Sequence, residues 1–89
     1  MYYSGGLNKE AQQKGGNNLE NNYIAENLKF LRKRKGLTQT EVAKALKVGI
    51  TTYNAWEKGV NIPRDEKKVA IAEFYGLSVG YIFFKPIAH

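Results

Sequence analysis

The chain has 89 residues, with 14 Lys or Arg against 8 Asp or Glu, a formal net charge of +6 and no cysteine. This length has room for one small domain, and without cysteine the chain forms neither disulfides nor a cysteine-ligated zinc site, so packing must stabilise the fold. Because His89 is the only histidine and Asp65 the only aspartate, neither a histidine-based nor an aspartate-paired catalytic site can be assembled, and we expect no enzyme activity, metal or cofactor.

Residues 1–22 have the composition of a flexible polar arm. They contain two Gly-Gly pairs, several Asn and Gln residues and few side chains able to build a core. A short helix over residues 8–14 would end at Gly15. We therefore expect the folded domain to comprise residues 23–89, and contact of the arm with DNA or a protein partner stays an alternative.

The first long helix is predicted from Tyr23 to about Lys35. Its apolar residues recur at helical spacing, and they are Ile24, Leu28 and Leu31. Asn22 is the candidate N-cap. Gly36 follows the basic run at 32–35, which matches both the glycine expected past a helix end and the cations favoured in its last turn.

A second helix is predicted from about Gln39 to Leu46. Thr38 is a good N-cap and Glu41 lies three residues later, which is the capping-box pattern. The third helix follows after only two residues and ends at Gly59, before Pro63.

The fourth helix is predicted to start at residue 64 or 65 and to end at Tyr75, before Gly76. Ser78 can cap a last turn or two that ends at about Phe83. No strand pattern competes, so the sequence predicts an all-α domain of five helices.

The excess positive charge lies entirely in residues 23–89, which hold 12 basic and 6 acidic residues, whereas residues 1–22 hold two of each. This favours an anionic partner such as nucleic acid, and charge that serves solubility alone is the alternative. No apolar run approaches the roughly 20 residues of a membrane span, and no signal-peptide pattern is present. We expect a cytoplasmic protein without a membrane partner.

The order of these helices, with a tight turn between the second and third, resembles the DNA-binding domain of phage repressor and Cro proteins, the Xre-type helix-turn-helix family. The resemblance covers residues 24–83. It rests on several features in order: Gln39 with Glu41, Val42 and Ala43 in helix two, Val48 in the turn, Glu57-Lys58-Gly59 at the end of helix three, Pro63, and the segment IAEFYGLSVGYI. It implies a compact five-helix repressor-like domain that binds double-stranded DNA.

In this family the N-terminal end of helix three meets base edges in the major groove. The positions that the resemblance assigns to base reading are Ile50, Thr51, Thr52, Asn54 and Ala55, while Tyr53 and Trp56 turn into the core. Thr51 and Asn54 can hydrogen-bond to bases, and asparagine suits adenine. Since Ile50 and Ala55 can only pack, for example on a thymine methyl group, we expect an A·T-containing half-site and a strong dependence on phosphate contacts and DNA shape. Packing of Ile50 against helix two is its alternative role.

Contacts to the DNA backbone are expected from residues around this helix. They are Gln39, Lys33, Gly49, Lys58, Asn61 and Arg64. The amide of Gln39 and the helix N-terminus can hold a phosphate, with ordinary first-turn solvation as the alternative. Arg32 and Glu57 match a pair that joins helix one to helix three in the family, so we assign Arg32 to structure.

Three regions depart from the family pattern or exceed what the domain needs. Lys67 and Lys68 fall near positions that are often apolar, which allows a rotated or later helix four, and Phe30 occupies a position that is usually exposed. The end of the chain carries four apolar residues in a row, at 81–84, and we expect two of them to close the core. Tyr81, Phe83 and Phe84 are the candidate dimer or partner contacts, and a dimer would set two reading helices about 34 Å apart.

These observations predict a sequence-specific transcriptional regulator, a repressor that binds a palindromic operator as a homodimer. An antitoxin-type module that neutralises a toxin and regulates its own operon is the alternative, with the arm or the C-terminal aromatics holding the protein partner. A nonspecific nucleic-acid or membrane-surface binder driven by charge is the third reading.

Overall fold

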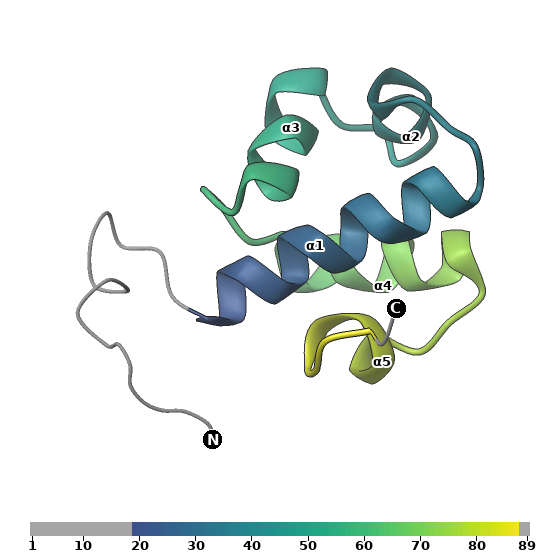
Figure 1. Ribbon diagram of the computed structural model, residues 1–89. Helices are drawn as coiled ribbons and strands as arrows, with labels where there is room; N and C mark the ends of the chain where they lie inside the picture. The colour runs from purple at the N-terminus through teal and green to yellow at the C-terminus, as the bar shows by residue number, and fades with distance from the viewer. Residues whose placement is uncertain (1–18, 88–89) are drawn as a thin grey trace.

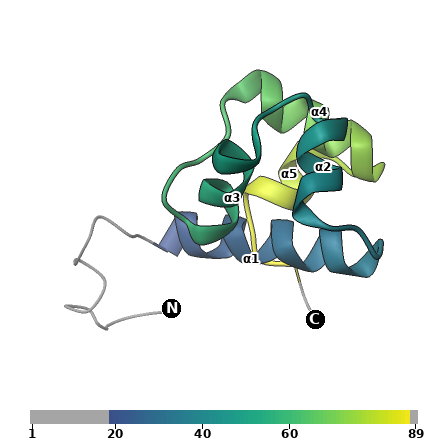
Figure 2. The ribbon, with the colours of Figure 1, turned by 90° about the horizontal axis from the view of Figure 1, so that it is seen from above.

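The computed structural model of the chain describes residues 19–87, with the backbone alone at 19–22. These residues form five helices and no strand: α1 (Leu19–Arg34), α2 (Gln39–Ala45), α3 (Ile50–Lys58), α4 (Asp65–Tyr75) and α5 (Val79–Phe83). The prediction of an all-α domain with five helices is confirmed. In Figure 1, α2 and α3 lie above α1, and α5 lies below it. Seen from above in Figure 2, α1 and α4 form opposite sides of the domain, and α2 and α3 lie across the space between them.

Helix α1 begins four residues earlier than its predicted start at Tyr23. It runs from Leu19, so Asn22 lies inside the helix and is not its N-cap. The prediction was wrong because nothing at 19–22 breaks a helix, and extending an existing helix costs far less than starting one. Residues 1–18, including the short helix considered at 8–14, and residues 88–89 lie outside the described part of the chain.

The predicted capping signals of the shorter helices are confirmed. The Thr38 backbone N–H donates to Glu41 Oε1 at 2.8 Å, and the Glu41 N–H donates to Thr38 Oγ1 at 3.1 Å, which completes the capping box of α2. Gly59 ends α3 with a left-handed φ of 79°. Ser78 caps α5, since its hydroxyl accepts from the Tyr81 N–H at 3.1 Å. Short-range hydrogen bonds therefore set most of the helix ends where the sequence places them.

All five helices contribute to one hydrophobic core. Its largest fully buried side chains are Ile24, Leu28, Val42, Tyr53, Ile71, Ile82 and Phe83, together with the polar Asn27. Of the four apolar residues at 81–84, Ile82 and Phe83 close the core, which confirms that two of them would do so.

The buried Asn27 side chain fixes the end of the chain onto α1. Its Nδ2 donates to the carbonyl oxygens of Ile82 at 2.7 Å and Lys85 at 2.9 Å, and its Oδ1 accepts from the Ile87 N–H at 2.9 Å. Tyr23 Oη adds a fourth bond, to the Phe83 carbonyl at 2.9 Å. The hydrogen bonds of this buried amide offset its desolvation cost and orient the segment after α5.

Helix α4 starts at Asp65, and its two unusual lysines are accommodated without a later start. Lys67 is half-buried and donates through Nζ to the Leu46 carbonyl at 3.0 Å. Lys68 lies over the Phe83 ring, with 5.8 Å between Nζ and the ring centroid. The aliphatic stems cover the core while the ammonium groups reach polar or aromatic partners.

Candidate nucleic-acid interface

Helices α2 and α3 form a compact unit joined by a four-residue turn. After the Leu46 C-cap the chain reverses at Lys47, which has a left-handed φ of 62° although it is not glycine. The Val48 N–H then donates to the Ala43 carbonyl at 3.0 Å. Gly49 is the N-cap of α3 and supplies no side-chain hydrogen bond. Because glycine has no side chain, no side chain at the N-cap of α3 accepts a hydrogen bond from the backbone N–H groups of the first turn.

Helix α3 turns two aromatic side chains inward and its N-terminal residues outward. Tyr53 and Trp56 are 1% and 4% exposed, which confirms that they belong to the core. Ile50 is 43% exposed, so a large part of its side chain faces solvent. Among the other candidate base-reading residues, Thr51 and Thr52 are exposed and Asn54 and Ala55 are half-buried. The helix is thus anchored on one side and free at its first turn on the other.

A hollow of about 510 Å³ beside α3 brings three candidate DNA contacts together. Its lining residues are Val48, Thr52, Trp56, Asn61, Ile62, Arg64, Glu66 and Lys67. Thr52 is a candidate base reader, whereas Asn61 and Arg64 are candidate backbone contacts. Lys58, at the end of α3, and Lys33, near the end of α1, are both exposed but do not line this hollow.

A hydrogen-bonded network centred on Glu57 ties α3 to α1. The Glu57 side chain is 2% exposed, and its two oxygens accept from Arg32 Nε at 2.7 Å and Nη2 at 3.1 Å. Arg32 also donates through Nη1 to the Leu37 carbonyl at 2.9 Å. Tyr53 Oη donates to Glu57 at 2.5 Å. The structural role predicted for Arg32 is confirmed.

The same network continues through Gln39 to Asn54 of α3, a link that the sequence did not predict. Gln39 Nε2 donates to Glu57 Oε1 at 2.9 Å, and Gln39 Oε1 accepts from Asn54 Nδ2 at 3.1 Å. The Gln39 side chain is therefore held by hydrogen bonds to Glu57 and Asn54 and is not simply solvated in the first turn of α2. No spacing signal points to this contact, because the Gln39 and Asn54 side chains meet only when α2 and α3 pack.

The network keeps its charges at neutral pH. Burial alone would raise the pKa of the Glu57 carboxyl, but hydrogen bonds from Arg32, Tyr53 and Gln39 outweigh it and hold that pKa below its ordinary value. The Glu57 carboxylate in turn raises the pKa of the Arg32 guanidinium. Burial, with the hydrogen bond to Glu57, raises the pKa of Tyr53. Glu57 is therefore an ionised group that only accepts hydrogen bonds.

Comparison with known proteins agrees with this architecture. A family model described as helix-turn-helix, HTH_3, matches residues 28–82, more than half of the chain. The chain belongs to this helix-turn-helix family. It is 38% identical over 56 residues to the cryptic phage CTXphi transcriptional repressor RstR of Vibrio cholerae, an alignment that covers 63% of this chain and 50% of that protein. The described fold also matches a crystal structure of a transcriptional regulator from Listeria innocua, with a TM-score of 0.66 and 31% identity over 70% of this chain and 58% of the other.

The chain spans about half the length of the curated relative it matches. The relatives are named as a transcriptional repressor and a transcriptional regulator. No described helix is long and apolar enough to cross a membrane. Within residues 19–87, no group of His, Cys, Asp or Glu side chains gathers where it could hold a metal ion.

The three aromatic residues expected to contact a partner of this helix-turn-helix protein differ in exposure. Phe83 is 1% exposed and belongs to the core, so it is not available as a surface contact; its side chain follows the buried face of α5. Tyr81 and Phe84 are 38% and 69% exposed. These two residues are called the C-terminal aromatic pair below.

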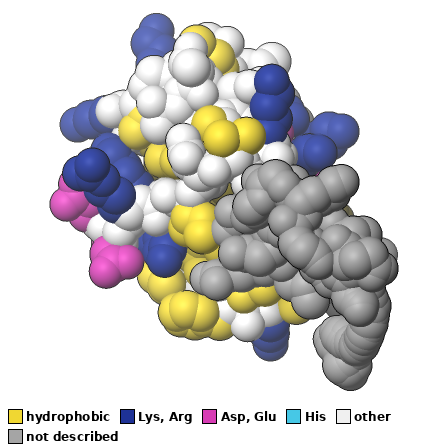
Figure 3. Space-filling view, turned by 90° about the vertical axis from the view of Figure 1, so that its left-hand side faces the viewer, with side chains coloured by type: hydrophobic (Ala, Val, Ile, Leu, Met, Phe, Trp, Pro, Cys, Tyr) yellow, Lys and Arg dark blue, Asp and Glu magenta, His cyan; other side chains and the backbone are white. Residues whose placement is uncertain are grey.

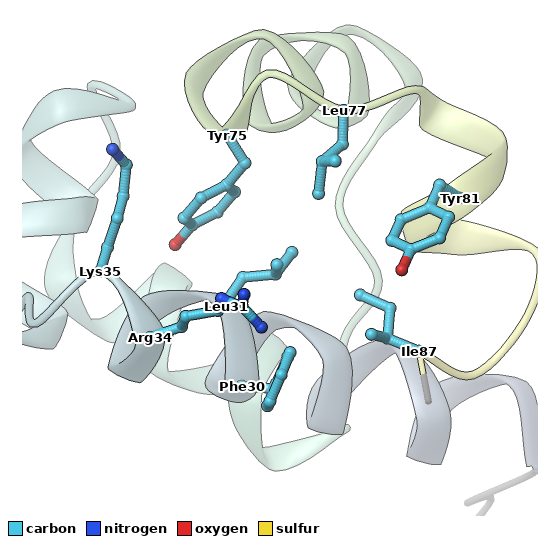
Figure 4. A pocket seen from close by; sticks show the side chains of 8 residues that line it. All are labelled: Phe30, Leu31, Arg34, Lys35, Tyr75, Leu77, Tyr81 and Ile87. Atoms are coloured by element: carbon cyan, nitrogen blue, oxygen red, sulfur yellow. The ribbon is translucent and has the colours of Figure 1, made fainter. Parts of the chain in front are cut away.

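A hollow of about 470 Å³, lined in part by Tyr81, lies between α1 and the segment from Tyr75 to Ile87 (Figure 4). The Tyr75 and Tyr81 rings stand at opposite ends of it, with Phe30 on the α1 side. Phe30 is half-buried against the core, with the Arg34 guanidinium 5.8 Å from its ring centroid. Tyr81 therefore belongs both to the C-terminal aromatic pair and to the lining of this partly apolar hollow, whereas Phe84 does not line it.

Proposed function

We propose that this helix-turn-helix protein is a sequence-specific repressor of transcription that acts in the cytoplasm, binds a palindromic operator as a homodimer and carries no catalytic activity. The observation that supports this most is the exposed first turn of α3, presented by a helix whose other side is anchored in the core. A helix about 10 to 12 Å wide fits the major groove of DNA. The curated relative is itself named a transcriptional repressor.

Base reading is assigned to the exposed side chains of the first turn of α3 and to the half-buried Asn54 and Ala55. Thr51 and Asn54 supply hydrogen-bonding groups, and Ile50 supplies an apolar contact suited to a thymine methyl group. With so few polar readers, the half-site contains A·T pairs, and much of the affinity comes from phosphate contacts and DNA shape. Thr52 and Ala55 complete the set of candidate readers.

Phosphate contacts are assigned to the polar and basic groups around α3. In Figure 3, most Lys and Arg side chains lie around the upper part of the face shown, the height at which α2 and α3 lie in Figure 1, and hydrophobic side chains lie at several heights of this face. The candidates are Lys33, Gln39, Gly49, Lys58, Asn61 and Arg64. Each lysine or arginine that contacts a phosphate should contribute about one unit to the slope of log affinity against log salt.

Dimerisation is assigned to the C-terminal aromatic pair. An exposed Phe84 and a half-exposed Tyr81 beside a hollow are costly to leave in water and suit a self-complementary contact. In Figure 1, α5 lies on the side of α1 opposite α2 and α3, so a contact there leaves α3 free. A dimer on two half-sites would place its reading helices about 34 Å apart.

The experiment is selection of bound duplexes from a random pool with the full chain, followed by affinity measurements on the selected duplex. Thr51→Ala should weaken binding by about tenfold, because a base contact contributes about 1 to 3 kcal/mol. Glu73→Ala is the matched control, since Glu73 is an exposed residue of α4 and carries no assigned contact. It should bind like the wild-type protein.

Two outcomes would contradict the proposal. Absence of any enriched sequence, with equal salt slopes on selected and random DNA, would leave a charge-driven binder. A selected sequence with a single half-site, bound by a monomer, would retain the regulator but remove the dimer, and the C-terminal aromatic pair would then be a surface for a different protein.

A further inference from the structure

The buried charge of Glu57 dictates how the Gln39 amide is turned. Glu57 is ionised and only accepts hydrogen bonds, and Gln39 Nε2 lies 2.9 Å from its Oε1. Turning the Gln39 amide over would place its carbonyl oxygen against the carboxylate, which is repulsive. Gln39 therefore keeps its NH₂ group toward Glu57 and its carbonyl oxygen toward α3.

The Gln39 carbonyl in turn dictates how the Asn54 amide is turned. Gln39 Oε1 can only accept, and it lies 3.1 Å from Asn54 Nδ2. Asn54 must therefore point its NH₂ group at Gln39. Within residues 19–87, no other hydrogen bond engages the Asn54 side chain, so Asn54 Oδ1 and the second N–H of Nδ2 stay available for a ligand.

The pair of groups left on Asn54 matches one base. Adenine shows an N6 donor and an N7 acceptor in the major groove, which Oδ1 and one Nδ2–H of an asparagine satisfy together. Guanine shows acceptors at both O6 and N7, so Oδ1 would face O6 and repel it. An unrestrained asparagine side chain can exchange its oxygen and nitrogen by rotating its last torsion, which is broad and two-fold. Here that rotation would break the bond to Gln39.

We infer that Glu57, acting through Gln39, is a positioning residue that holds Asn54 in the orientation selective for adenine over guanine. This deepens the proposed function and rests on it. Asn54 contacts the base, and Gln39 contributes to specificity as well as to any phosphate contact it makes. The buried pair of Glu57 with Arg32 would then affect which operator is bound as well as fold stability.

The test replaces Gln39 with methionine in the full chain. Gln39→Met keeps the length of the side chain, and the bonds from Arg32 and Tyr53 to Glu57 stay in place. The first step finds the A·T pair of the selected duplex at which Asn54→Ala loses discrimination against G·C. Wild type should prefer adenine there by about tenfold or more, and Gln39→Met should lose most of that ratio.

The double variant separates positioning from a phosphate contact. In the Asn54→Ala background, adding Gln39→Met should leave the adenine-to-guanine ratio unchanged, because the readout it controls is already gone. If Gln39→Met alone weakens both duplexes equally and keeps the ratio, Gln39 acts on the phosphate only and the inference is overturned. Gln39→Ala gives the same comparison should the methionine variant fail to fold.

Failure of this inference and failure of the proposed function are distinguishable. A wild-type protein that selects no sequence removes the proposed function before any variant is made. A wild-type protein that selects a sequence whose recognition is lost in Thr51→Ala but unaffected by Asn54→Ala keeps the regulator and overturns the positioning role.

Discussion

Removing the hydroxyl of Tyr53 should lower the free energy of unfolding, whereas removing the hydroxyl of Tyr75 should leave that free energy unchanged or raise it. Tyr53 Oη donates to the ionised Glu57 carboxylate at 2.5 Å. Tyr75 Oη is buried and has no hydrogen-bond partner in the described part of the chain, and burial raises the pKa of Tyr75 to about 12. One hydroxyl therefore stabilises a buried charge, whereas the other is desolvated and has at most a weak interaction with the Tyr53 hydroxyl.

The expected magnitudes follow from these environments. A hydrogen bond to a charged group contributes about 1.5 to 3 kcal/mol, and Glu57 keeps Arg32 and Gln39 as donors when Tyr53 Oη is removed. Tyr53→Phe should thus lower the free energy of unfolding by about 2 kcal/mol. Tyr75→Phe should leave it unchanged or raise it by up to about 1 kcal/mol, because an unsatisfied polar group leaves the interior.

The assay is urea unfolding followed by fluorescence of Trp56, the single tryptophan, which is 4% exposed and lies 5.8 Å from Tyr53 between ring centroids. Circular dichroism checks that both transitions coincide, so that a two-state free energy applies. If Tyr53→Phe costs less than about 0.5 kcal/mol, or if both variants lose stability equally, the charge-centred network does not stabilise the domain as argued.

Three further predictions concern pH, the end of α3 and self-association. Because the folded-state pKa of Glu57 is lowered, its contribution to stability is present above its unfolded-state pKa of about 4.3 and is lost as pH falls through the folded-state pKa. The free energy of unfolding should therefore fall less between about pH 6 and pH 3 in Glu57→Gln than in wild type. Equal losses of this free energy would contradict the prediction. Gly59→Ala should lower the free energy of unfolding in urea by about 1 kcal/mol, because φ at this position is 79°. Gly80→Ala in α5 is the control: an added Cβ meets only Phe84 Cδ2 at 3.8 Å, so the free energy of unfolding should be unchanged or slightly raised. Phe84→Ser should lower the association constant of the proposed homodimer by about tenfold or more in sedimentation equilibrium and leave the free energy of unfolding unchanged, because an exposed phenylalanine contributes to a dimer and not to the core. An unchanged association constant would exclude Phe84 from the contact.

Sequence patterns predicted the features of this fold that depend on nearby residues. Thr38 and Glu41 cap α2 because they lie three positions apart, and Gly59 ends α3 because glycine adopts a left-handed φ without strain. The start of α1 was not predicted because the residues just before Tyr23 do not break a helix. The left-handed φ of Lys47 was not predicted because such turn positions are usually occupied by glycine or asparagine.

Contacts between distant residues were not predictable from local pattern. Asn27 bonds to atoms 55 to 60 positions away, and a single asparagine in an amphipathic helix gives no sign that it will be buried. The choice of Phe83 over Phe84 for the core depends on how α5 is rotated, and a five-residue helix has too few turns for periodicity to decide. Among the candidate DNA contacts, Ile50, Thr51 and Thr52 are exposed, whereas Asn54 and Ala55 are half-buried. The bond between Gln39 and Asn54 depends on the packing of α2 against α3 and was not predictable.

The arrangement around Glu57 separates two ways in which a substitution would weaken DNA binding in the proposed function. A helix of nine residues is too short to be stable alone, so α3 holds its position through Tyr53, Trp56 and the carboxylate at its last turn. Changes there alter unfolding and binding together. Thr51 is exposed and is not part of the core cluster, so substitutions there should alter binding while leaving the free energy of unfolding within about 0.5 kcal/mol of wild type. Gln39 lies between these classes: its loss should change base preference more than stability, because Arg32 continues to neutralise Glu57.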